Sequence, residues 1–219
     1  MKFPLLLIIL FPLTLLNAQN FSPEEADHFL DQLAAERAKM QGVTKNFREE
    51  KRLAMVSQPL ITSGTIAFQP PDHFRREVTG ENASFSASNG ETLWIYYPEL
   101  NEAEKYNLKE RGPVRDSILA IITSLNFQDL KKNFRYQMHQ NSEGWELNLE
   151  PKSSALRRIF QSMTIQLEKQ RRVSRINLVT QSGDKTLIAF WNEKEKSFPA
   201  DYFNFTPPKN ANISSPLGK

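Results

Sequence analysis

The sequence has no cysteine among its 219 residues and only eight glycines. The absence of cysteine excludes disulfide bonds, thiol chemistry and a lipid attached through a cysteine that follows the leader. Hydrophobic residues make up 39% of the chain. The stability of the fold must therefore come from a packed core.

Motifs that mark common catalytic and metal sites are also missing. His28, His73 and His139 show no spacing typical of metal ligands, and no G-x-S-x-G nucleophile elbow or glycine-rich phosphate loop occurs. The acidic pairs Glu24-Glu25 and Glu49-Glu50 fit a helix start and a solvated strand face. We therefore predict that the protein is not an enzyme and holds no metal or cofactor.

Basic and acidic residues are nearly balanced, with 28 Lys and Arg against 25 Asp and Glu, so the net charge is only +3. The basic pairs Arg157-Arg158 and Arg171-Arg172 lack the interleaved aromatic residues of nucleic-acid-binding segments. We predict no nucleic-acid partner.

The one long hydrophobic run lies at the N-terminus, over residues 5–16. This run is shorter than the roughly 20 residues that span a bilayer. It follows the positive Lys2 and precedes the small Ala18, a pattern typical of an export signal. We predict that residues 1–18 are a removed signal peptide, with an uncleaved anchor as the alternative, and that residues 19–219 form a single domain.

Helical and strand patterns then alternate in a definite order. Ser22-Pro23-Glu24-Glu25 is a capping box with proline at the first helical position, and it predicts an amphipathic helix that ends at Gly42. A short apolar helix is expected over 118–125, with a second helical turn over 127–131. About eleven antiparallel strands are expected in this mainly β (α+β) protein, over 44–55, 60–69, 73–79, 83–88, 91–97, 102–108, 133–140, 144–150, 161–168, 173–181 and 185–192.

The hairpin Ser88–Pro98 carries the strongest β pattern in the sequence. Asn89 and Gly90 form the turn, and the following strand is apolar or amphipathic on both faces. A strand of this kind either lies inside a sandwich or lines a hollow, and alternation does not decide which face points inward. So many short strands close into a barrel or fold over a core, and apolar helices could cover an open concave face or complete a solid core.

Several stretches, taken in order, resemble the LolA family of periplasmic outer-membrane lipoprotein carriers. The matching pieces are Ser63–Phe68 ahead of Pro71, then Phe74, the Ser88–Pro98 hairpin, Glu150-Pro151-Lys152 and the final Phe203–Pro208. The resemblance implies an incomplete, strongly curved antiparallel barrel with an apolar hollow face and a helical lid. It further implies a periplasmic monomer that takes acylated lipoproteins from an inner-membrane ABC-type release complex to an outer-membrane acceptor, without a covalent step.

Candidate residues for such a carrier fall into two groups. Those predicted to line the cavity are Phe47, Phe68, Phe74, Leu93, Trp94, Ile95 and Tyr96, and ordinary core packing is the alternative for each. Those predicted to form the lid are Ile118, Leu119, Ile121, Ile122 and Leu125.

The sequence departs from the family pattern at one position. Many members carry an arginine directly before the proline that follows the second strand, where it holds the lid closed, but this chain has Pro70 there. The resemblance thus predicts that the latch is absent or is supplied by Gln69, Arg75 or Arg76.

Two other functions fit the same fold. One is a carrier for a different amphiphile, such as a glycolipid or a polyene lipid. The other is a periplasmic sensor of lipoproteins, which would normally bring an additional domain.

The lid assignment generates a first prediction. Replacing Ile121 and Ile122 with serine should leave the barrel folded and increase the binding of an apolar dye, because the lid would compete less well for the concave face. Dye fluorescence would be compared with circular dichroism of the same samples. Unchanged dye binding in a folded variant would show that this helix is not a lid.

Overall fold

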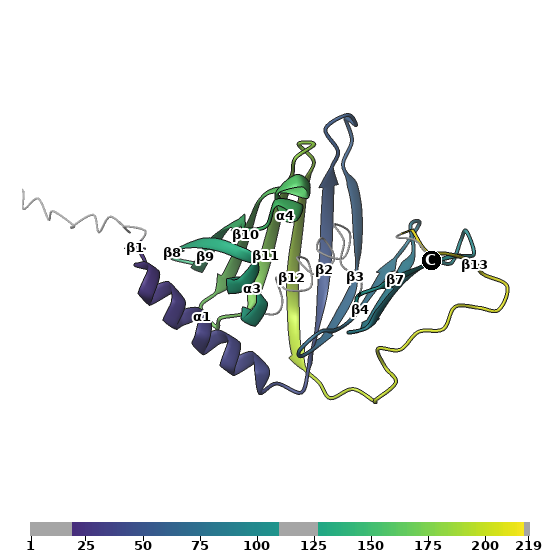
Figure 1. The fold of residues 1–219 in the computed structure, drawn as a ribbon, viewed down its shortest axis with the longest axis horizontal. Coiled ribbons are helices and arrows are strands. Elements are labelled where there is room, and N and C mark those ends of the chain that lie inside the picture. The colour runs from purple at the N-terminus through teal and green to yellow at the C-terminus, as the bar shows by residue number, and fades with distance from the viewer. Residues whose placement is uncertain (1–18, 110–126, 217–219) are drawn as a thin grey trace, which may run out of the picture.

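A computed structural model of the chain describes residues 19–109 and 127–216 (Figure 1). The predicted incomplete barrel is confirmed, because thirteen strands form one curved sheet whose two edge strands do not pair with each other. The strand order is β1-β8-β9-β10-β11-β12-β2-β3-β4-β5-β6-β7-β13. Every neighbouring pair is antiparallel except β7 and β13, which are parallel.

Three helices accompany these strands in the described part of the chain. The helices are α1 (Pro23–Ala38), α3 (Phe127–Asn133) and α4 (Ser154–Ile159). The strands are β1 (Gln19–Asn20), β2 (Val43–Arg52), β3 (Leu60–Gln69), β4 (His73–Thr79), β5 (Ser84–Asn89), β6 (Thr92–Tyr97), β7 (Glu102–Asn107), β8 (Phe134–Gln140), β9 (Gly144–Pro151), β10 (Phe160–Glu168), β11 (Val173–Thr180), β12 (Lys185–Glu195) and β13 (Asn212–Ser214).

The eleven predicted strands correspond to β2 through β12. The sequence reasoning missed the two short edge strands, β1 and β13, and the six-residue helix α4. Ser153 caps α4, since its hydroxyl accepts a hydrogen bond from the backbone N–H of Leu156. The predicted lid helix over 118–125 lies outside the described residues.

Helix α1 begins where the capping box predicts. The backbone N–H of Ser22 donates to the Glu25 carboxylate at 2.8 Å, and the N–H of Glu25 donates back to the Ser22 hydroxyl at 3.2 Å. The helix ends at Ala38, earlier than predicted, and buries Ala26, Phe29, Leu30 and Leu33. Its apolar stripe therefore covers part of the sheet.

The hydrophobic core is unevenly distributed over the concave face. Side chains of α1 and α3 join those of β8 to β12 and of β2 to β4 in one large cluster. The strands β6 and β7 contribute to a separate small cluster of Leu93, Tyr106 and Leu108. In Figure 1, α1 and α3 lie over the β8–β11 half of the sheet, and the β4–β7 half curves away from them.

The chain after β12 crosses the opposite, outer face of the sheet. We call residues 196–211 the C-terminal strap; it runs beside β4–β7 to β13 (Figure 1). The Phe205 ring lies 4.6 Å from Phe85 and 5.7 Å from Tyr96, centroid to centroid. The Arg75 guanidinium donates to the carbonyl oxygen of Tyr202 at 2.9 Å and lies 4.7 Å from the Phe85 ring. These contacts hold the strap on the outer face.

Gly64 marks a place where two strands approach closely. It sits on β3 between Phe47 of β2 and Val78 of β4, and a Cβ added there would lie 1.8 Å from the backbone oxygen of Glu77. Since backbone atoms cannot move aside cheaply, Gly64→Ala should lower the free energy of unfolding by about 1–3 kcal/mol, measured by urea denaturation. Thr65→Ala, on the exposed neighbouring residue, should cost less. Equal losses would contradict the close approach.

Candidate functional site

A cavity of about 350 Å³ opens on the concave face of the sheet. Its volume falls within the range of pockets that hold small ligands. The described strands β2–β6 and β10–β12 supply its wall, and most of the side chains are apolar. They are Phe47, Glu49, Lys51, Ile66, Phe74, Arg76, Ser86, Leu93, Ile95, Phe160, Ile176, Leu178, Thr180, Asp184, Thr186, Ile188 and Phe190.

Sheet register decides which face of β6 points into this cavity. Leu93 pairs with Ser88 and Ile95 pairs with Ser86 of β5. Both Leu93 and Ile95 line the cavity with Ser86. Trp94, one residue out of phase, lies on the outer face 6.3 Å from the Phe205 ring. The sheet register thus shows which residues of β6 face inward, which the sequence left open, and the contact of Trp94 with the C-terminal strap agrees with it.

The seven residues predicted to contact a ligand are divided by this geometry. Trp94 and Tyr96 lie on the outer face with Phe205, and Phe68 is buried beside Phe74 without joining the cavity wall. The other four come together on the wall: Phe47, Phe74, Leu93 and Ile95. Contact of any of them with a ligand stays a prediction, and the five lid residues lie outside the described ranges.

A charged pair is set into this mainly apolar wall. The Arg76 guanidinium lies 3.1 Å from the Glu49 carboxylate and 4.4 Å from the centre of the Phe47 ring. Burial lowers the pKa of Arg76, and the charge of Glu49 opposes this shift. Arg75 points to the outer face and bonds to the strap. Of the two arginines considered as a latch, only Arg76 faces the cavity.

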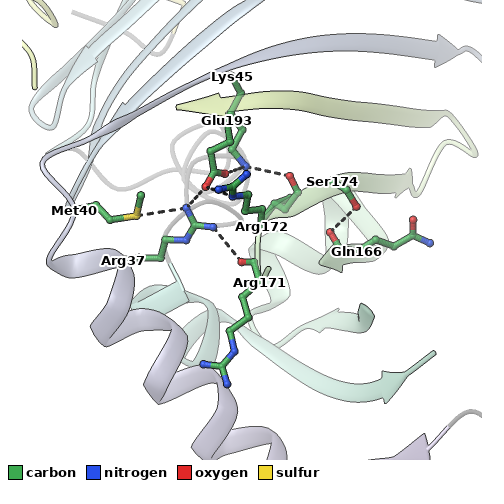
Figure 2. Close-up of polar contacts among 9 residues, drawn as sticks. Arg37, Met40, Lys45, Gln166, Arg171, Arg172, Ser174 and Glu193 are labelled. Atoms are coloured by element: carbon green, nitrogen blue, oxygen red, sulfur yellow. Dashed lines mark hydrogen bonds and ion pairs between the residues drawn. The ribbon is translucent and has the colours of Figure 1, made fainter. Parts of the chain in front are cut away.

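A second charged cluster joins the end of α1 to the sheet, on the side shown in Figure 2. Glu193 lies within a bulge of β12, between Trp191 and Lys194, where the register shifts and Asn192 adopts a φ of 56°. Its carboxylate lies 2.9 Å from the Arg37 guanidinium, 2.6 Å from the Lys45 ammonium and 3.8 Å from Nε of Arg172. One carboxylate therefore forms ion pairs with three cationic side chains.

The same cluster is tied to the backbone of the turn between β10 and β11 and of the first residue of β11. Lys45 donates to the carbonyl oxygen of Val173 at 3.0 Å, and Arg37 donates to that of Arg171 at 3.1 Å. Burial lowers the pKa of Lys45, and Glu193 opposes that shift. Burial would raise the pKa of Glu193, but the charges of Lys45 and Arg37 outweigh burial and lower it. These groups hold α1 in place over its half of the sheet.

Neither a cluster of metal ligands nor a membrane-spanning helix occurs among the described residues. Those residues contain no group of three or more His, Cys, Asp or Glu side chains that could hold a metal ion. None of the helices described is long and apolar enough to cross a membrane.

Comparison with known proteins gives one consistent family. The family described as "Outer membrane lipoprotein carrier protein LolA" matches residues 38–206. An outer-membrane lipoprotein carrier protein from Cupriavidus necator is 31% identical over 154 residues, which cover 69% of this chain and 70% of that protein. One from Azotobacter vinelandii is 26% identical over 208 residues, covering 93% of this chain and 98% of that protein.

A solved structure shares the fold. An uncharacterized conserved protein from Thermus thermophilus superimposes with a TM-score of 0.52 and 12% sequence identity. The match covers 87% of this chain and 99% of that chain. At this identity the likeness concerns the fold alone.

The Glu193 cluster can be tested by removing its single anion. Glu193→Gln leaves the buried Lys45 without its ion-pair partner, so the free energy of unfolding at neutral pH should fall by about 3–5 kcal/mol. Glu195→Gln, an exposed position on the same strand, removes an equal charge and should cost far less. Adding Lys45→Met to the Glu193 variant should restore much of the loss, because no unpaired buried charge would remain.

The pH dependence of stability gives an independent measurement. Because the pKa of Glu193 is lower in the folded chain than its ordinary value of 4.5, its contribution is present above that value and is lost as the pH falls through the folded-state pKa. Urea denaturation at a series of acidic pH values should therefore show a steeper loss of stability in the natural protein than in Glu193→Gln. Parallel curves would contradict the role given to this carboxylate.

Proposed function

The chain belongs to the LolA family, and we propose that its cavity holds the acyl chains of a lipoprotein during transport between the two membranes of the cell envelope. The observation that carries the proposal is the cavity of about 350 Å³ on the concave face, walled mainly by apolar side chains. Acyl chains are the ligand that such a wall fits best, since their transfer from water is favourable without specific polar contacts.

The energetics support a carrier that releases its cargo. Each buried methylene contributes roughly 0.8 kcal/mol, so one long acyl chain could gain on the order of 10 kcal/mol as an upper bound. Release requires a competitor for the same face. We propose that the segment of Ile118, Leu119, Ile121, Ile122 and Leu125 is that competitor, so that cargo displaces it on loading and it displaces cargo on handover.

Membership of the family supports a transport route across the cell envelope. Residues 1–18 would be removed after export, and the mature carrier would act as a periplasmic monomer. It would receive lipoproteins from an inner-membrane ABC-type release complex and deliver them to an acceptor at the outer membrane. Binding and release without covalent chemistry would complete the cycle.

The polar pair inside the cavity bears on the nature of the cargo. The guanidinium of Arg76 lies in the wall and keeps donor groups besides the contact with Glu49. It could therefore meet a carbonyl or an anionic group at the head of an amphiphile. This feature also suits the alternative, a carrier for a glycolipid or another amphiphile.

Mass spectrometry of the protein purified from its native periplasm without detergent tests the proposal directly. An acylated lipoprotein bound in equal amount would support it. A small glycolipid or polyene lipid bound instead would contradict lipoprotein cargo and favour the alternative, a carrier for another amphiphile. A protein that carries neither and also fails to bind an apolar dye would contradict a carrier function.

The place of binding can be tested with one substitution and a matched control. Ser86→Trp puts a large side chain into the cavity wall, because Ser86 faces inward between Arg76 and Ile95. It should lower the affinity for a fluorescent acyl probe about tenfold or more. Thr65→Trp adds the same side chain at an exposed position on β3 and should leave the affinity unchanged. Equal affinities in the two folded variants would place the probe elsewhere.

A further inference from the structure

Exposed apolar side chains gather at one end of the molecule. We call residues 53–61 the hairpin tip. It comprises the connection between β2 and β3 and the first two residues of β3, and it projects farthest at the top of Figure 1. Five of the eight large hydrophobic residues that are exposed in the described chain lie in it: Leu53, Met55, Val56, Leu60 and Ile61. Met55 is 98% exposed. Soluble proteins rarely present so many apolar side chains together unless a partner covers them.

The hairpin tip is held in place by the neighbouring turn. The backbone N–H of Ala54 donates to the Asp184 carboxylate at 2.8 Å. This bond, with the hydroxyl of Ser182, lowers the pKa of Asp184. This hydrogen bond fixes the hairpin tip against the turn between β11 and β12. The backbone that carries Met55 and Val56 is therefore held in place, with both side chains exposed to solvent.

Basic side chains surround this apolar surface. Arg52, whose side chain is 63% exposed, ends β2 and pairs in register with Lys185 of β12. Arg157 and Arg158 are exposed on α4, and the carbonyl oxygen of Arg157 accepts a hydrogen bond from Gln181 at 2.8 Å, which ties α4 to the same turn. In Figure 1, α4 and both turns lie at one end of the molecule.

The acidic groups among them are mostly engaged. Glu50 lies 2.5 Å from Arg52 and 3.7 Å from Arg48, so it is shared between two cations. Asp184 accepts the bonds from Ala54 and Ser182. The end of the molecule thus combines protruding apolar side chains with a basic surround.

We propose that the hairpin tip docks on an anionic lipid surface. Met55 and Val56 would enter the boundary between headgroups and acyl chains, and the basic side chains of Lys185 and α4 would face the lipid phosphates. Apolar insertion and electrostatic attraction together are what stable attachment to a bilayer surface needs. A protein groove could also accept the apolar side chains, but the surrounding cations favour a dense anionic surface.

The docking would bring the cavity close to the lipid. Four residues of the cavity wall lie at the hairpin-tip end: Lys51, Thr180 and Thr186 near the ends of their strands, and Asp184 in the turn between β11 and β12. An amphiphile that leaves the cavity at this end would therefore meet the bilayer without crossing open water. Lipid docking itself does not depend on what the cavity holds.

The first experiment uses the absence of cysteine from the chain. Met55→Cys in the otherwise unchanged protein takes a single environment-sensitive NBD label at the hairpin tip. Vesicles of phosphatidylethanolamine and phosphatidylglycerol should shift the emission to the blue and raise its intensity. The matched control is Leu100→Cys, since Leu100 is 63% exposed on the turn between β6 and β7. No shift at residue 55, or an equal shift at both positions, would overturn the proposal.

The second experiment measures attachment by vesicle co-sedimentation. Met55→Ser with Val56→Ser should weaken binding to the anionic vesicles about tenfold or more, and Leu100→Ser should leave binding unchanged. Phosphatidylcholine vesicles should bind the natural protein weakly, and added salt should weaken its binding to anionic ones. Equal binding by the natural protein and the double serine variant would contradict the proposal.

Two further readouts separate this proposal from the others. The double serine variant should bind a fluorescent acyl probe like the natural protein, because neither residue belongs to the cavity wall. Ser86→Trp, in contrast, should lose probe binding and keep normal vesicle binding. Such a result tests the cavity and leaves lipid docking unaffected. The natural protein could also fail to bind lipid vesicles while the double serine variant lowers lipoprotein transfer to acceptor membranes. That pair of results would indicate a protein partner for the hairpin tip and overturn lipid docking.

Discussion

The rest of the structure depends on one constraint: a single curved sheet has an apolar concave face, and among the described helices α1 and α3 cover only part of it. Apolar area left in water costs roughly 25 cal/mol per Å². Helices α1 and α3 remove such area from the β8–β11 half, and the ion cluster of Glu193 keeps α1 there. Beside them the strands enclose a cavity. The hollow is therefore a consequence of unequal coverage of one sheet.

The local sequence was sufficient to predict most of the elements. Gly90 and the alternating patterns on either side of it place β5 and β6 closely. Gly90 takes the positive φ that the turn needs, but Asn89, also predicted to lie in the turn, is the last residue of β5 and does not. The capping box at Ser22 fixes the start of α1. Strands β1 and β13 and helix α4 were missed, since two, three and six residues carry too little periodicity to stand out.

The candidate site was harder to predict, because contacts between distant segments decide it. Leu93 and Trp94 are both apolar. The sheet register, which puts Leu93 in the cavity wall and Trp94 near the Phe205 ring of the strap, shows which of them faces outward. The Glu193 cluster depends on a bulge that no local pattern indicates, and it joins α1, β2 and β12. Two apolar faces and a buried lysine are signals that a partner exists, but sequence alone does not identify the partner.

The short edge strands limit how the protein can associate through the edges of its sheet. An open sheet offers unpaired N–H and C=O groups along its outermost strands, and these can template fibrils or edge-to-edge oligomers. Here the sheet ends in β1, with two residues, and β13, with three. Both consist mostly of polar residues, and β13 runs parallel to its neighbour. A second copy that paired with β1 or β13 would meet only two or three residues of backbone there, so pairing at these two strands offers little to hold separate molecules together.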